Sequence, residues 1–205
     1  HLRHRARHPH EHHHQLRSST IITVKQLKQT FADISPILTK TRKTGIKSLE
    51  YANLRVEDGR MYLYATDRFV AVESYVGETD GDDVSLYFSQ DVLKTVCSFP
   101  PASRVTVVGK ALQVESAGTV STFKAVDVDF DAPDIKKLID MAWNYDNYFI
   151  PADDIEPYGL DVGQVKHIKG CVLVPRFDRL GGGIRFQVPG RVRGIVAHTR
   201  LKEGS

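Results

Sequence analysis

Residues 49–76 constrain the fold of this chain most strongly, because they read as a β-hairpin followed by a third strand. The dipeptide Asp58-Gly59 separates two runs in which apolar and polar residues alternate. A tight hairpin turn needs positive φ angles, which glycine adopts without steric cost. We therefore predict antiparallel strands on both sides of this turn, with Ala52, Leu54 and Val56 on one face.

An amphipathic helix is predicted before the hairpin. It begins at Thr23, because the Thr-x-x-Gln pattern from Thr23 to Gln26 has the form of a capping box. Apolar residues then recur at three- and four-residue steps, at Val24, Leu27, Phe31, Ile34 and Leu38. Pro36 is expected to end or kink this helix, so that the basic residues after it lie on a loop.

The order of helix and strands then repeats. Ser89 is expected to cap a second helix from Gln90 to Ser98, and strands are predicted at residues 104–108, 111–115 and 120–126. This order indicates an internal duplication of about 60 residues. A shortened third unit begins near Tyr148 and Phe149 and ends in three strands, predicted at residues 171–177, 184–188 and 193–199.

Composition divides the chain further. Seven of the nine histidines lie in the first fourteen residues, so residues 1–20 are interpreted as a disordered leader or tag. We predict one domain of two half-units over residues 21–137 and a partial second domain over residues 138–205. The sequence has no apolar run long enough to span a membrane. Cys97 and Cys171 lie in apolar contexts and are expected to be buried thiols in a reducing cytoplasm.

The segment Ala65-Thr66-Asp67-Arg68-Phe69 resembles the A-T-D element of bacterial and phage DNA sliding clamps, which are processivity factors like the β subunit of DNA polymerase III. Residues 129–134 resemble the linker that ends a clamp domain, and residues 194–201 resemble the last clamp strand. The resemblance implies a compact, divergent member with an α+β fold, in which helices line one face of antiparallel sheets. It also implies a homo-oligomeric ring around double-stranded DNA, without catalytic activity or cofactor. Its partners would be a DNA polymerase and a clamp loader, bound through clamp-binding peptides.

Charge is balanced outside the leader, with 24 basic and 24 acidic residues, but it is unevenly distributed. Basic residues dominate residues 24–60 and 162–205, and acidic residues dominate residues 73–91 and 127–161. Such a protein can present a basic surface to phosphate while it remains nearly neutral overall. Each basic residue alone is equally consistent with a solvated helix face. The resemblance implies that DNA is contacted by Lys25, Lys28, Lys40, Arg42, Lys43, Lys94, Lys166 and Lys169.

Motifs for catalysis or metal binding are absent from the sequence: it has no phosphate-binding loop, no H-E-x-x-H and no Cys-x-x-Cys. The aspartates of residues 127–134 lack the glycine and distal glutamate of an EF-hand, so we interpret them as a linker. Trp143 lies in an acidic segment, which favours packing over stacking on a nucleic-acid base. Two other functions stay open. One is a clamp-like regulatory module that binds a replication or transcription protein without encircling DNA. The other is an enzyme acting on a nucleotide or carbohydrate, with Asp67 or Asp127 in its site.

Overall fold

The structure is a computed structural model that describes residues 21–128, 132–144, 158–159, 164–174, 183–197 and 199–200. The predicted leader and the predicted start of the third unit near Tyr148 lie outside these residues. The elements are β1 (Ile22–Thr23), α1 (Val24–Thr41), the 3-10 turn η1 (Lys47–Leu49), β2 (Tyr51–Glu57), β3 (Arg60–Thr66), β4 (Val70–Glu78), β5 (Val84–Ser89), α2 (Gln90–Val96), β6 (Arg104–Val108), β7 (Ala111–Ser116), β8 (Thr119–Lys124), α3 (Ile135–Asn144), β9 (Tyr158–Gly159), β10 (Val172–Val174), β11 (Gly183–Val188), β12 (Val192–Ala197) and β13 (Thr199–Arg200).

The two half-units predicted in residues 21–137 exchange their first strands. Strand β1 opens the first half but pairs with β6 of the second, while β5 opens the second half and pairs with β2 of the first. The result is a four-stranded sheet in the order β1-β6-β7-β8 and a second sheet that contains β5-β2-β3-β4. All of these pairings are antiparallel, which confirms the predicted α+β class with antiparallel sheets.

The predicted hairpin is confirmed in detail. Asp58 and Gly59 have φ angles of 50° and 71°, and β2 pairs with β3 directly beside them. Two consecutive positive φ angles match the right-handed twist of the flanking strands. The side chains predicted to share one face, Ala52, Leu54 and Val56, are all buried in the main hydrophobic core.

Helix α1 begins where the capping box predicts, with the Thr23 N–H donating to Gln26 Oε1 at 2.9 Å. The helix does not end at Pro36 itself but continues to Thr41, so Lys40 lies on α1 and the predicted basic loop begins only after it. Pro36 cannot donate to the carbonyl of Ala32, but both residues are exposed, so water can satisfy that carbonyl. Ile34 and Ile37 stay buried on the opposite side and hold both halves of the helix against the sheet.

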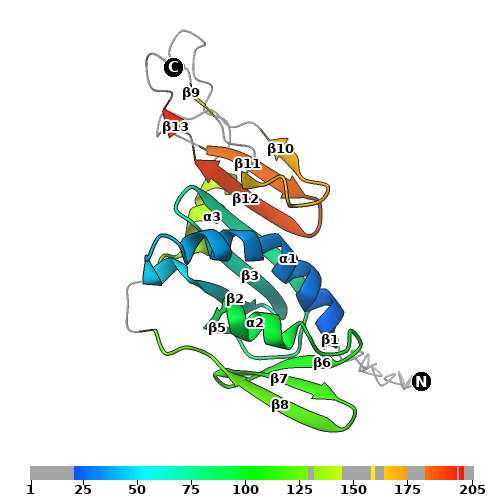
Figure 1. Cartoon of the computed structure of the whole chain (residues 1–205). Helices are drawn as coiled ribbons and strands as arrows, with labels where there is room; N and C mark the ends of the chain where they lie inside the picture. Colours follow the sequence, from blue (N-terminus) through cyan, green and yellow to red (C-terminus); the bar gives the residue numbers. More distant parts are fainter. Residues whose placement is uncertain are drawn as a thin grey trace, which may run out of the picture.

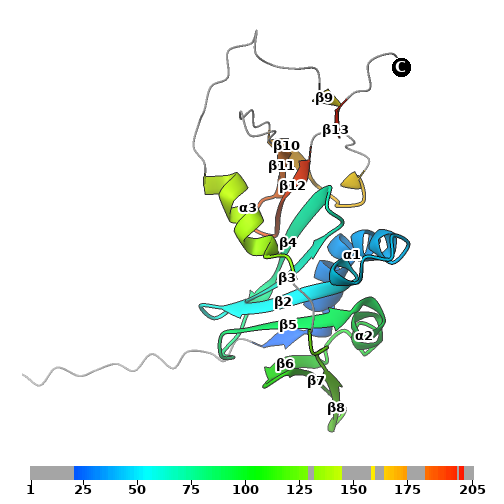
Figure 2. The ribbon, with the colours of Figure 1, turned by 90° about the vertical axis from the view of Figure 1, so that its left-hand side faces the viewer.

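The helices lie in layers on both sides of the larger sheet. Helices α1 and α2 cover one face, which we call the inner face, and α3 lies on the other, which we call the outer face (Figure 2). Residues 138–148 were expected to form a helical turn or a connector, whereas α3 is a ten-residue helix that also includes the predicted domain boundary near Lys137. Ile135 and Ile139 of α3 pack against Tyr64 and Ala71 of the sheet. In the part of the chain that is described, no helix is long and apolar enough to cross a membrane.

The C-terminal strands extend the sheet of the first domain. Strand β12 pairs antiparallel with β4 from Val192↔Ser74 to Val196↔Val70, which gives a seven-stranded sheet in the order β10-β11-β12-β4-β3-β2-β5 (Figure 1). Gly194 lies in this junction. A Cβ atom there would stand 2.3 Å from the Ala71 carbonyl oxygen and 2.4 Å from Phe186 Cζ, so only glycine fits.

Candidate nucleic-acid interface

Helices α1 and α2 form an antiparallel pair on the inner face. At one end, Arg42 after α1 pairs with Asp91 at the start of α2, with 3.1 Å between Nη1 and Oδ1. At the same end, Gln90 Nε2 at the start of α2 donates to Thr39 Oγ1 near the end of α1 at 2.7 Å. At the other end, the backbone N–H of Lys25 in α1 donates to the carbonyl oxygen of Pro101, in the segment after α2, at 3.0 Å. The start of α1 therefore lies beside the end of α2.

This arrangement places three of the predicted DNA-contacting residues on the layer formed by α1 and α2. Lys25 and Lys28 are exposed on the first turns of α1, and Lys94 is exposed near the end of α2. Within the described residues, none of the three forms an ion pair, so their charge is available to a ligand. Cationic side chains on adjacent helices can bind successive phosphates of a duplex without contacting its bases.

The basic residues at the other end of α1 are partly neutralised by acids. Lys40 Nζ lies 2.6 Å from Oδ2 of the buried Asp67, and Arg42 pairs with Asp91 on the surface. Lys43 is exposed in the turn after α1 and has no ion pair among the described residues. A phosphate approaching this end would meet one free lysine and two cations that already have partners.

Asp67 fixes the turn of the A-T-D element. Its Oδ1 accepts the N–H groups of Phe69 at 2.9 Å and Val70 at 2.8 Å, while Oδ2 accepts from Lys40. The hydroxyl oxygen of Thr66 accepts the Arg68 N–H, and Arg68 has a φ of 80°. Short polar side chains hold the turn because they supply acceptors for its freed backbone donors. Both oxygens of Asp67 are thus engaged in structure.

Lys166 and Lys169 lie on a short segment, residues 164–170, that packs against α1 on the inner face (Figure 2). His167 Nε2 donates to the Asp33 carbonyl oxygen of α1 at 2.8 Å, and Val165 and Ile168 are buried in the core shared with α1. Both lysines are exposed. The predicted residues of the first domain and of the third unit therefore lie on the same face of the sheet.

The outer face of the junction carries a charged network that sequence reasoning missed. Glu73 of β4 is buried; it accepts a hydrogen bond from the Tyr64 hydroxyl at 2.7 Å and forms an ion pair with Arg193 of β12. Arg193 also reaches Asp140 of α3, with 2.6 Å between Nη2 and Oδ1. The hydrogen bond to Glu73 is the main reason that the pKa of Arg193 is raised, and burial raises the pKa of Tyr64. This network joins the strands of both units to α3.

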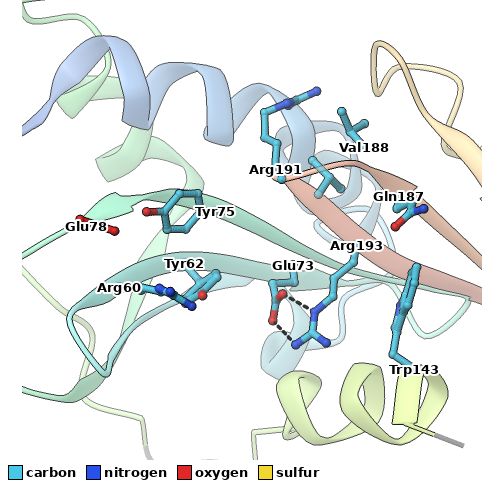
Figure 3. Close-up of a pocket in the computed structure, with 12 residues that line it drawn as sticks. Arg60, Tyr62, Glu73, Tyr75, Glu78, Trp143, Gln187, Val188, Arg191 and Arg193 are labelled. Atoms are coloured by element: carbon cyan, nitrogen blue, oxygen red, sulfur yellow. Dashed lines mark hydrogen bonds and ion pairs between the residues drawn. The ribbon is translucent and has the colours of Figure 1, made fainter.

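A cavity of about 500 Å³ opens beside this network on the outer face (Figure 3). Its walls include the rings of Tyr62, Tyr75 and Trp143 and the side chains of Arg60 and Glu78. Trp143 packs against the cluster around Tyr64, as the predicted packing role requires. Three aromatic rings around a solvent-filled space are typical of surfaces that bind proteins or peptides.

Neither cysteine has the environment of a reactive thiol. Burial raises the pKa of Cys97 to about 11 and also raises the pKa of Cys171. Both thiols are therefore protonated and weakly nucleophilic at neutral pH. Among the residues that the structure describes, no three or more histidine, cysteine or acidic side chains are grouped to hold a metal ion. Asp127, a candidate of the enzyme hypothesis, is highly exposed and lies 3.6 Å from Lys110 Nζ.

Comparison with solved structures identifies the fold. The β subunit of DNA polymerase III from Thermotoga maritima superposes with a TM-score of 0.61 and 16% identity, over 89% of this chain and 65% of that one. The DNA polymerase sliding clamp from Pseudomonas aeruginosa gives 0.60 and 15%, over 91% and 65%. The clamp from Bacillus subtilis gives 0.60 and 11%, over 91% and 66%. The chain has the sliding-clamp fold.

The likeness is one of fold, since these identities are too low to carry function. The chain spans about two thirds of the length of each of these three clamps. No protein-family model and no curated protein sequence matches it. The clamp fold here combines an inner face of helices and exposed lysines with an outer face that carries α3 and the aromatic cavity.

Proposed function

We propose that this protein is a DNA sliding clamp, a processivity factor that encircles duplex DNA as a homo-oligomeric ring and tethers a DNA polymerase. The observation that carries the proposal is the inner face, where α1, α2 and residues 164–170, all of which carry exposed lysines, lie on one side of the sheet of a clamp fold. Phosphate contacts of this kind give affinity without sequence information, so the protein stays on DNA and slides. It needs no catalytic residue of its own.

The open edge of β8 supports assembly into a ring. Among the strands that the structure describes, β8 pairs only with β7, and its Val120 is 55% exposed. The strand is rich in β-branched residues, and an edge of this kind is a template for a further strand. In the C-terminal unit the corresponding third strand, β12, already pairs with β4. We propose that β8 pairs with a strand of another copy.

Charge reversal on the inner face tests the DNA contact. Changing Lys25, Lys28 and Lys94 to Glu is expected to weaken binding to duplex DNA, because three cations that face phosphate are replaced by anions. The slope of log affinity against log salt should fall by about 0.9 for each lost phosphate contact. Fluorescence anisotropy with a labelled duplex at several salt concentrations measures both quantities.

The matched control carries the same change in net charge elsewhere. Arg60, Lys110 and Lys137 are exposed and lie outside the α1–α2 layer, so their reversal to Glu should leave the salt slope nearly unchanged. Equal losses of DNA affinity in the two triple variants would show that the inner face is not the binding surface.

Encirclement is tested separately. A ring loaded on a nicked circular DNA by a clamp loader should stay bound in high salt and be lost when the circle is linearised, since a ring slides off a free end. Light scattering across a concentration range should give one oligomeric mass. A persistent monomer with no preference for circular DNA would contradict the ring.

The aromatic cavity favours one alternative function, a regulatory module that binds a replication or transcription protein without encircling DNA. The rings of Tyr62, Tyr75 and Trp143 line a cavity on the outer face (Figure 3) and offer a contact surface there. This function predicts a monomer whose partner binding is lost on changing Trp143 to Ala and is insensitive to reversal of Lys25, Lys28 and Lys94.

A further inference from the structure

Asp33 is a buried acidic residue within the inner helix α1. It is 5% exposed and lies between apolar residues that face the core. Its Oδ2 accepts a hydrogen bond from the Ser74 hydroxyl at 2.8 Å and forms an ion pair with Arg191. Arg191 comes from the turn between β11 and β12, so the ion pair joins the first domain to the C-terminal unit. A buried carboxylate is stable only with such partners.

The same site holds the segment that carries Lys166 and Lys169. Arg191 Nη2 donates to the Lys169 carbonyl oxygen at 3.1 Å, and His167 Nε2 donates to the Asp33 carbonyl oxygen at 2.8 Å. These bonds connect α1, β4, the β11–β12 turn and residues 164–170, and Asp33 and Arg191 take part in all of them between them. Lys166 and Lys169 themselves point to no acid among the described residues and are exposed.

We propose that Asp33 and Arg191 are positioning residues that hold Lys166 and Lys169 beside α1, so that the lysines of both units form one phosphate-binding surface. The inference rests on the proposed DNA contact of the inner face. A lysine on a segment that is ordered before binding contributes more affinity than one on a segment that must be ordered by the ligand, because the entropic cost is already met. Asp33 and Arg191 need not touch DNA.

Asp33→Asn is the first test. The substitution keeps the shape of the side chain and an acceptor for Ser74, but it removes the ion pair with Arg191. It also removes a negative charge from the inner face, which on Coulombic grounds alone would strengthen DNA binding. We expect the opposite: affinity for duplex DNA falls by roughly tenfold at moderate salt and the salt slope falls by up to about 2, the contribution of two phosphate contacts.

A double-mutant cycle separates positioning from general damage. Changing Lys166 and Lys169 together to Gln should cost as much DNA affinity as Asp33→Asn. Combining all three changes should cost little more, because both variants remove the same phosphate contacts. Asp140→Asn is the matched control: it removes an aspartate ion pair on the outer face and should leave DNA affinity unchanged. Additive losses, or unchanged affinity in Asp33→Asn, would overturn the inference.

Hydrogen–deuterium exchange of the free protein gives a readout that does not depend on DNA. Amides of residues 164–170 should exchange at least tenfold faster in Asp33→Asn than in the parent, and at the parent rate in Asp140→Asn. Arg191→Lys, which keeps the charge but loses the two-pronged contact, should show the same change if Asp33→Asn fails to fold. Unchanged exchange in a folded variant would overturn the positioning role, whereas a parent protein that binds no DNA would overturn the proposed function alone.

Discussion

Asp67 is the residue whose side chain does most to shape the turn after β3. It accepts two backbone N–H groups of its own turn and one ammonium group from α1, and its side chain is almost fully buried. Hydrogen bonds to a buried carboxylate are stronger than those between neutral groups. This turn also sets the path of β4, the strand with which β12 of the C-terminal unit pairs.

Changing Asp67 to Ala is therefore expected to lower the free energy of unfolding by about 3 kcal/mol, since two backbone donors and Lys40 lose a charged acceptor. Urea denaturation followed by circular dichroism measures the loss. Asp91→Ala is the control, because the Arg42–Asp91 pair is exposed and its removal should cost less than about 1 kcal/mol. Equal losses in both variants would contradict the structural role of Asp67.

At this scale the sequence is informative only for short-range features. The Asp58-Gly59 turn and the Thr23–Gln26 capping box involve residues within four positions of one another, so both could be predicted. Arg191 and Asp33 are 158 positions apart, and nothing local in either segment indicates the other. The sequence does show an acidic residue, Asp33, beside the apolar stripe of α1, but it does not show which residue pairs with Asp33.

Among the elements, α3 is the one whose place depends most on charge. Its buried side is small, with Ile135 and Ile139 on the sheet, and much of its attachment comes from ion pairs of Asp134, Lys136 and Asp140. Burial alone would raise the pKa of Asp140, but hydrogen bonds from Lys136 and Arg193 outweigh it and hold the pKa below the ordinary 3.8.

This shift predicts a pH dependence for the attachment of α3. A carboxyl group with a lowered pKa in the folded state contributes stability that is complete above its unfolded pKa and is lost as the pH falls through its folded pKa. The difference in unfolding free energy between the parent and Asp140→Asn should therefore be constant above about pH 5 and shrink below about pH 4. Denaturation curves at several pH values measure it. A difference that grows toward acid would contradict the sign.

Helix prediction succeeded where the apolar pattern was long and failed where tertiary contacts decided. The start of α1 followed from its stripe and its cap, and Ser89 caps α2 as predicted, accepting the Val92 N–H at 3.3 Å. Pro36 does not end α1, because buried residues on either side of it keep the helix against the sheet as far as Thr41. Residues 135–144 gave too short a pattern to show that they form a helix on the outer face.

For the whole molecule, the exposed edge of β8 is the feature with the clearest consequence for assembly. Changing Val120 and Thr122 to Lys places two charges on that edge, where they disfavour pairing with another strand. We expect the oligomer to dissociate while the unfolding free energy of each chain changes by less than about 0.5 kcal/mol, as for other surface changes. Light scattering and denaturation measure the two effects.

Val108→Lys serves as the control, because Val108 is an exposed valine at the end of β6 and lies away from the β8 edge. An oligomer that survives the β8 changes, or that is lost equally in the control, would place the contact between copies elsewhere.

For the whole molecule too, the sequence predicts the helices and strands but not which strands pair. The repeated order of helix and strands was visible in residues 21–126, but the exchange of β1 and β5 between the two sheets was not, because strand partners cannot be identified from alternation alone. The pairing of β12 with β4 depends on Gly194, because a side chain there would clash with Ala71 and Phe186. The sequence alone does not show that these two residues are its neighbours.

That pairing makes the junction between the two units a stretch of unbroken sheet. Bending it would break several interactions together. These are the backbone hydrogen bonds between β4 and β12, the ion pairs of the buried carboxylates on both faces, and the close packing around Gly194. We therefore expect the two units to move together as one rigid body. If such bodies form a ring, we expect the ring to open at the contacts between molecules, where whatever opens it has to act.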